Sequence, residues 1–170
     1  GGYVAAFTGE EVGIDTRESA EDVARMLAEL FSIAAWRVKS HHVLDRAVNA
    51  TAGRLALINL LSERAHPTQA IADVLTLADN FGGGDLNSLR GRHVTYLGDA
   101  TNVAKSLAVA CVRLGCSVSI AAPDGYQVGV DFLNAANELA VHGAELVLTD
   151  DPISAMQGAD AVYTDAFVSM

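Results

Sequence analysis

The sequence predicts an α/β protein in which parallel sheets are covered by helices. Short apolar runs rich in β-branched residues alternate with segments whose apolar residues recur at helical spacing, once before residue 66 and again after residue 85. An apolar fraction of 51% over 170 residues is enough for a sizeable core. We therefore expect two parallel-sheet α/β domains, residues 1–66 and 85–170, joined by a linking helix and glycine-rich linker at residues 67–84.

The first half is expected to contain strands at residues 3–8, 32–38 and 55–60, because each is a short aromatic, β-branched or aliphatic run. The run at 32–38 is apolar enough for a buried strand. Residues 9–15 are rich in glycine and acids and indicate a loop. Ser19 and Asp22 are spaced as in a capping box and predict a helix start, and apolar residues after the His41-His42 pair mark a second helix.

A third helix is expected to begin at His66. Pro67 suits the first helical position, and apolar residues recur behind it at helical spacing. The first amides of a helix lack intrahelical partners and carry the positive end of the dipole, so His66 and Gln69 could cradle an anionic or polarised oxygen. The alternative is that His66 merely caps the helix.

The second half repeats the alternation after Phe-Gly-Gly-Gly-Asp at residues 81–85, which we expect to be the most flexible segment and the domain boundary. Strands are predicted at residues 93–97, 117–121, 145–149 and 161–164. Helices are predicted at about residues 102–114, 130–142 and 152–157.

The formal net charge of −10 argues against nucleic acids and anionic membranes as partners, since both are held largely by Lys and Arg. No apolar run is long enough to cross a bilayer, and the first residues lack the basic region of a signal peptide, so we expect a cytoplasmic protein. Cys111 and Cys116 flank a predicted helix end. Their side chains are expected to point apart and to stay as free buried thiols.

Arg37 ends the apolar strand at 32–38. An arginine there is costly to bury unless an anion meets it, and its planar fork of donors suits a phosphate or a polarised carbonyl. The alternative is an ion pair with Asp22 or Glu29. His41 and His42 do not predict a metal site, because adjacent side chains diverge and no third ligand is suitably spaced, so we interpret them as a helix cap.

In the second half, residues 98–102 (Gly-Asp-Ala-Thr-Asn) connect a strand to a helix, which is where open α/β sheets bind ligands. One glycine alone does not make a dinucleotide fingerprint, and the segment could simply form a turn and a cap. Asp165 and Ser169 follow the last predicted strand and place an acid and a hydroxyl at the same edge, although a surface loop is the common alternative.

Taken together, these motifs resemble the aspartate/ornithine carbamoyltransferase family, and within it the ornithine enzymes. The resemblance covers nearly the whole chain. The motifs that carry it are Gly1-Gly2, Arg17-Glu18-Ser19 with Asp22-Val23-Ala24-Arg25, Trp36-Arg37, Ile58-Asn59, His66-Pro67-Thr68-Gln69-Ala70 with Ala72-Asp73, Gly98-Asp99-Ala100-Thr101-Asn102-Val103-Ala104, Ala122-Pro123, and Tyr163-Thr164-Asp165-Ala166-Phe167-Val168-Ser169-Met170.

The resemblance implies transfer of the carbamoyl group of carbamoyl phosphate to L-ornithine, giving L-citrulline and phosphate in arginine biosynthesis or in arginine and citrulline metabolism. The residues matching carbamoyl phosphate ligands are Arg37, His66 and Gln69, with Arg37 and His66 as the catalytic pair. The residues matching ornithine ligands are Asn102, Asp165, Ser169 and Met170. The resemblance further implies a homotrimer or a multiple of one, with Arg17 as a possible contributor to a neighbouring subunit, and no metal or organic cofactor.

Three departures from the family pattern matter. The family's upstream Ser-x-Arg-Thr segment and downstream His-Cys-Leu-Pro loop do not occur in these residues, so the chain resembles the middle of such an enzyme, with both domains incomplete and no activity expected from it alone. Ala100 replaces a usual glycine, which questions the local backbone geometry. Arg17 stands where a lysine is common.

Two alternatives stay open. One is a carbamoyltransferase for another amine, such as putrescine or an acylated ornithine. The other is a non-catalytic, carbamoyltransferase-like binding or scaffold protein.

Overall fold

The computed structural model describes residues 2–165, and the chain divides into two compact units, residues 1–62 and residues 63–170. Both units are α/β, and every strand pair in the described residues is parallel, as the sequence predicted. No helix within residues 2–165 is both long and apolar enough to cross a membrane.

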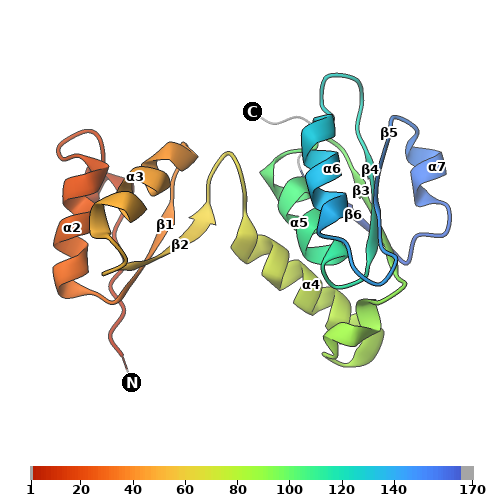
Figure 1. The fold of residues 1–170 in the computed structure, drawn as a ribbon, viewed down its shortest axis with the longest axis horizontal. Helices are drawn as coiled ribbons and strands as arrows, with labels where there is room; N and C mark the ends of the chain where they lie inside the picture. Colours follow the sequence, from red (N-terminus) through yellow and green to blue (C-terminus); the bar gives the residue numbers. More distant parts are fainter. Residues whose placement is uncertain (1, 166–170) are drawn as a thin grey trace. The chain divides into compact units, whose positions relative to one another are not determined.

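Unit 1 contains a two-stranded parallel sheet and two longer helices (Figure 1). Its elements are α1 (Gly9–Val12), α2 (Ala20–Leu30), β1 (Ile33–Arg37), α3 (His41–Thr51) and β2 (Ala56–Leu61). A cluster of buried side chains from α2, β1 and α3 forms its core, with Val23, Trp36 and Leu44 among them. The expected helix starts at Ser19 and around His41 are confirmed, since Ser19 caps α2 and Ser40 precedes α3.

Two expectations for the first half were wrong. Residues 2–7 form no strand, because composition favours a strand only where a neighbouring strand is available to pair with it. Part of the expected loop is the short helix α1, whose start is fixed by a capping box between Thr8 and Glu11. The strand β1 exists, but Trp36 is its one fully buried residue, since its other positions are exposed or half-buried.

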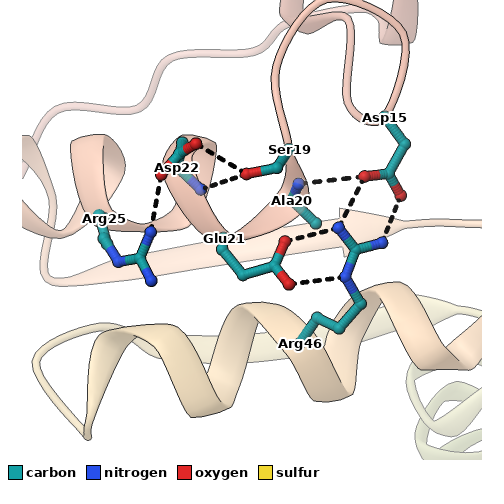
Figure 2. A network of polar contacts seen from close by, with 7 residues as sticks. All are labelled: Asp15, Ser19, Ala20, Glu21, Asp22, Arg25 and Arg46. Carbon is teal, nitrogen blue, oxygen red and sulfur yellow. Dashed lines mark hydrogen bonds and ion pairs between the residues drawn. The ribbon is translucent and has the colours of Figure 1, made fainter.

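Arg46 holds α3 against the start of α2 (Figure 2). Its guanidinium donates from Nε to Glu21 Oε1 at 2.8 Å and from Nη1 to Asp15 Oδ2 at 2.9 Å. Asp15 also accepts from the backbone N–H of Ala20 at 3.2 Å. The hydrogen bonds from Arg46 lower the pKa of Glu21 from 4.5 to about 2.

This network predicts an acid-sensitive unit 1. Because the pKa of Glu21 is lower in the folded state, the unfolded state binds more protons, and the stabilisation present above pH 4.5 is lost as the pH falls to about 2. Arg46→Gln should lower the melting temperature at neutral pH by a few degrees and flatten its fall over that range. Arg25→Gln, which breaks only the exposed pair with Asp22, is the control and should keep the wild-type slope. An unchanged slope in Arg46→Gln would contradict this assignment. Thermal melts followed by Trp36 fluorescence measure it.

Unit 2 contains a four-stranded parallel sheet in the order β5-β4-β3-β6. Its elements are α4 (Pro67–Gly82), the 3-10 helix η1 (Leu86–Leu89), β3 (His93–Leu97), α5 (Asn102–Val112), β4 (Ser117–Ala121), α6 (Val130–Glu138), β5 (Leu146–Thr149), α7 (Pro152–Met156) and β6 (Ala161–Thr164). Helices α5 and α6 lie on one side of the sheet and α7 on the other, as Figure 1 shows, which is the arrangement expected from right-handed crossovers for this strand order. The chain adds β4 and then β5 on one side of β3 and returns to place β6 on the other side, so the strand order reverses between β3 and β6.

The helix α4 packs on unit 2. Its buried Val74 and Ala78 belong to the core of that unit, together with Tyr96, Leu107 and Ile120. The compact division therefore falls after Ser62, ahead of the glycine-rich segment that the sequence suggested as the boundary.

The glycine-rich segment forms the end of helix α4, and its expected flexibility stays a prediction. Gly83 and Gly84 both have positive φ, and their backbone N–H groups donate to Asp79 and Ala78 carbonyls at 3.2 and 3.1 Å. Asp85 then caps η1 by accepting from the backbone N–H of Asn87. Glycine runs are common in flexible segments, but glycine is also favoured at a helix end, where the backbone needs a positive φ.

The two cysteines are free and buried, but their thiols do not point apart as we expected. Gly115, with φ of 80°, reverses the chain after α5, and the Cys116 backbone N–H donates to the Cys111 carbonyl at 3.0 Å. The neighbouring Cys116 thiol and burial together raise the pKa of the Cys111 thiol, while Cys116 Sγ donates to the Ser117 carbonyl at 3.6 Å.

Candidate active-site residues

His66 is the N-cap of α4, and Pro67 is the first helical residue, as predicted. Its side chain makes no capping hydrogen bond, so the imidazole is not used for the alternative role that the sequence left open. The backbone N–H of His66 instead donates to Ser106 Oγ at 2.8 Å. His66 therefore stands at a helix N-terminus with its imidazole unused by the cap.

Ser106 connects His66 to Asn102. The Ser106 hydroxyl donates to the Asn102 carbonyl at 2.8 Å while accepting from His66, so the N-termini of α4 and α5 meet through one side chain. Asn102 is the first residue of α5, after the N-cap Thr101. Sequence reasoning missed Ser106. Its position four residues after Asn102, on the same helix face, was the available signal.

Asp165 lies at the same edge of the sheet as the turn that leads to Asn102. Leu97, the last residue of β3, pairs with Thr164, the last residue of β6, so Gly98 and Asp165 leave the sheet from paired positions. This is the point where the strand order reverses, and open α/β sheets bind ligands in the crevice at such points. Asp165 is exposed there. The expected position of Asp165 at the end of the last strand is confirmed, and the pairing with the Ser169 hydroxyl falls outside the described residues.

The turn accepts Ala100 without strain. Gly98 has a φ of 122°, whereas Ala100 is absent from the positive-φ residues of the described chain. The Ala100 N–H donates to the Tyr126 carbonyl at 2.9 Å, and the residue is buried. The doubt that an alanine raised about this backbone was therefore wrong, because the position that needs glycine is Gly98.

Two tyrosines lie on the strands that lead to this edge of the sheet. Tyr96 of β3 and Tyr163 of β6 stack with ring centroids 5.7 Å apart, and the Tyr96 hydroxyl donates to the Asp99 carbonyl at 3.0 Å. Burial is the main cause that raises the pKa of both phenols to about 12. The turn is thus held by a neutral hydrogen-bond donor at physiological pH.

Gln69 lies one turn into α4, and its amide Nε2 donates to Asp73 Oδ1 at 2.9 Å. Within residues 2–165, no three His, Cys, Asp or Glu side chains gather as a metal-binding group. Unit 2 therefore brings together His66, Asn102 and Asp165 at helix and strand ends, with Gln69 on the first turn behind His66.

Arg37 ends β1 in unit 1, where the register with β2 shifts between Trp36 and Arg37. Such irregularities re-aim side chains. Arg37 is exposed, so the expected burial of this arginine was wrong, and its role as an anion ligand stays a prediction. The ion-pair alternative was also wrong, because Asp22 pairs with Arg25 and Glu29 pairs with Arg54. Among the described residues, Arg37 has no ion-pair partner.

Arg17 and the His41-His42 pair also lie in unit 1. The guanidinium of Arg17 donates to the Glu11 carbonyl at 2.7 Å. His41 is the first residue of α3, where Ser40 takes the cap position, and its Nδ1 lies 2.8 Å from Ser62 Oγ. Ser169 and Met170 lie outside the described residues.

The family models fit this arrangement. The carbamoyl-phosphate-binding domain of the aspartate/ornithine carbamoyltransferases matches residues 1–79, and the aspartate/ornithine-binding domain of the same family matches residues 90–170. The chain belongs to this family. The two family models lie on either side of the glycine-rich segment, since one ends at residue 79 and the other begins at residue 90. The compact units divide earlier in the chain, after Ser62 and before α4.

Ornithine carbamoyltransferases are among the similar proteins. The enzyme from Methanococcus vannielii is 37% identical over all of this chain and 54% of its own length, and that from Bacillus subtilis is 35% identical over 51% of its length. The solved ornithine carbamoyltransferase from Pyrococcus furiosus matches 94% of this chain and 49% of its own, with a TM-score of 0.84 and 32% identity. The Thermus thermophilus structure gives 0.78 and 36%, covering 95% and 51%. The chain thus spans about half the length of these carbamoyltransferases.

Proposed function

We propose that the protein carrying this chain transfers the carbamoyl group of carbamoyl phosphate to the side-chain amine of L-ornithine, giving L-citrulline and phosphate. The observation that carries the proposal is the link from His66 through Ser106 to Asn102, beside Asp165 at the reversal of strand order. It ties a residue matched to carbamoyl phosphate to residues matched to ornithine. The family membership and the similarity to ornithine carbamoyltransferases support the same reaction.

Carbamoyl phosphate is assigned to Arg37, His66 and Gln69. Attack on the carbamoyl carbon places negative charge on its oxygen, and donors already aimed at that oxygen stabilise the charge without reorganising. The planar fork of Arg37 and the imidazole of His66 are side chains of the kind that can donate to such an oxygen. Neither side chain forms an ion pair with another described residue, and the imidazole of His66 has one long contact, 3.5 Å from Nδ1 to Thr68 Oγ1.

Ornithine is assigned to Asn102, Asp165, Ser169 and Met170. The carboxylate of Asp165 is exposed at the mouth of the sheet, where it can attract a cationic amino acid. The reacting amine must lose its proton before attack, which requires that it be bound away from excess negative charge. On this assignment, residues 1–66 together with Gln69 of the linking helix supply the carbamoyl phosphate side, and residues 85–170 supply the ornithine side. The reaction would serve arginine or citrulline metabolism in the cytoplasm and needs no cofactor.

A steady-state assay of the full-length protein tests the function. With carbamoyl phosphate as the donor, we expect citrulline and phosphate in equal amounts with L-ornithine, and little product with putrescine or N-acetylornithine. A preference for either of these amines would overturn the assignment of L-ornithine as the substrate. No transfer to any amine would favour a binding or scaffold role.

The active protein is expected to be a homotrimer or a multiple of one, with Arg17 contributing to a neighbouring subunit. Arg17 lies on the exposed loop after α1, held by the Glu11 carbonyl. Light scattering of the full-length protein at its assay concentration should give three times the chain mass or a multiple of that. An active monomer would exclude the shared role of Arg17.

A further inference from the structure

Asp73 of α4 lies on the same helix face as Gln69, four residues further on. One carboxylate oxygen, Oδ1, accepts a hydrogen bond from Gln69 Nε2 at 2.9 Å. The other, Oδ2, is buried and has no hydrogen-bond partner within residues 2–165. The side chain therefore contacts a residue assigned to carbamoyl phosphate and carries an uncompensated polar atom.

Helix stability alone does not account for this pair. A Gln and an Asp at i and i+4 stabilise an exposed helix only slightly, whereas a buried carboxylate oxygen without a partner is costly. Asp79, on the same helix, is exposed and avoids that cost. The half-buried position of Asp73 therefore indicates that its carboxylate has a role in orienting the side chains that it contacts.

Tyr163 is the second neighbour of Asp73. The charge of Asp73, after burial itself, contributes to raising the pKa of this phenol to about 12, so the hydroxyl stays protonated and can donate. Tyr163 also stacks on Tyr96, which holds the turn at Asp99. Asp73 thus stands between Gln69 and the tyrosine pair that supports the turn leading to Asn102.

A carboxylate can only accept hydrogen bonds, so it selects one orientation of the Gln69 amide. The amide nitrogen must face Asp73, and the amide oxygen is left as an acceptor. We propose that Asp73 is a positioning residue that fixes Gln69 with its amide oxygen presented to the amino group of carbamoyl phosphate. This inference rests on the proposed function.

The test uses Asp73→Asn in the full-length protein. An amide at residue 73 can donate as well as accept, so Gln69 no longer has one preferred orientation. We expect kcat/KM for carbamoyl phosphate to fall about tenfold, the value of one charge-assisted hydrogen bond. The melting temperature should stay equal or rise, because the charge of a half-buried carboxylate with one unpartnered oxygen is removed. Asp79→Asn makes the same charge change on the exposed face of α4 and should leave kcat/KM within about twofold of wild type.

Two double variants separate positioning from a general structural role. In a Gln69→Ala background, Asp73→Asn should change kcat/KM by less than about twofold, since its effect passes through Gln69. In a Gln69→Glu background, the same change at residue 73 should raise kcat/KM. The introduced amide then donates to the carboxylate at residue 69, and a like-charge contact between two carboxylates is removed.

Equal losses from Asp73→Asn with and without Gln69, or a loss of activity that follows a lower melting temperature, would overturn the inference. A wild-type protein without carbamoyl transfer would instead overturn the proposed function, which is a distinct result.

Discussion

Arg37→Ala in the full-length protein is expected to lower kcat by about 10²–10³-fold while leaving the fold intact. Arg37 is exposed at the end of β1 and has no ion-pair partner among the described residues, so its removal costs little packing. Its donors are proposed to act on the charge that develops in the transition state. The loss should therefore appear in kcat and kcat/KM together. Steady-state kinetics with an unfolding curve measure both.

Arg54→Ala is the matched control for Arg37. It removes the same charge from the same unit, but Arg54 pairs with Glu29 on the surface, so activity should be unchanged. Arg37→Lys should recover only part of the loss, because a lysine keeps the charge without the planar fork of donors. Full activity in Arg37→Ala would return this residue to a structural role.

His66→Ala is expected to lower kcat by about 10²-fold, with less change in KM for ornithine. The imidazole is not used to cap α4, and the contact with Ser106 is made by the backbone N–H, which the substitution retains. Helix α4 should therefore still begin at Pro67. Steady-state kinetics with both substrates measure the expected loss in kcat. Far-UV circular dichroism checks that the helix content is unchanged.

The matched variant is Ser106→Ala, which breaks the link to Asn102 and leaves the imidazole in place. It should raise KM for ornithine more than it lowers kcat. If the two variants gave the same kinetic pattern, the separate roles assigned to His66 and Asn102 would be contradicted.

Much of unit 2 could be predicted from the sequence. The strands β3, β4 and β6 have the predicted bounds, because buried parallel strands are nearly continuous apolar runs between clear turns. Helix α6 ends at Glu138, short of the predicted residue 142, where positive φ at His142 turns the chain. The error at residues 2–7 concerns strand pairing, which composition does not specify.

The candidate site was predictable where a motif marked it. His66, Asn102 and Asp165 stand at helix or strand ends that the sequence identifies, and parallel strands bring such ends to one edge. Ser106 was missed because a lone serine inside a helix resembles any solvated residue, and Asp73 was part of a motif but received no role for the same reason. Their partial burial and their hydrogen bonds distinguish them, since Ser106 bonds a residue of another helix and Asp73 bonds a residue on its own helix face. Only the three-dimensional structure shows these features.

The single tryptophan distinguishes the two units spectroscopically. Trp36, the single tryptophan of the sequence, is buried in unit 1, whereas the stacked Tyr96 and Tyr163 lie in unit 2. Fluorescence excited at the red edge of indole absorption therefore follows unfolding of unit 1 alone. The ultraviolet absorbance of ionised phenol, which for these two tyrosines develops only near pH 12, follows unit 2. One sample can thus report whether the units melt together or in succession, without any added label.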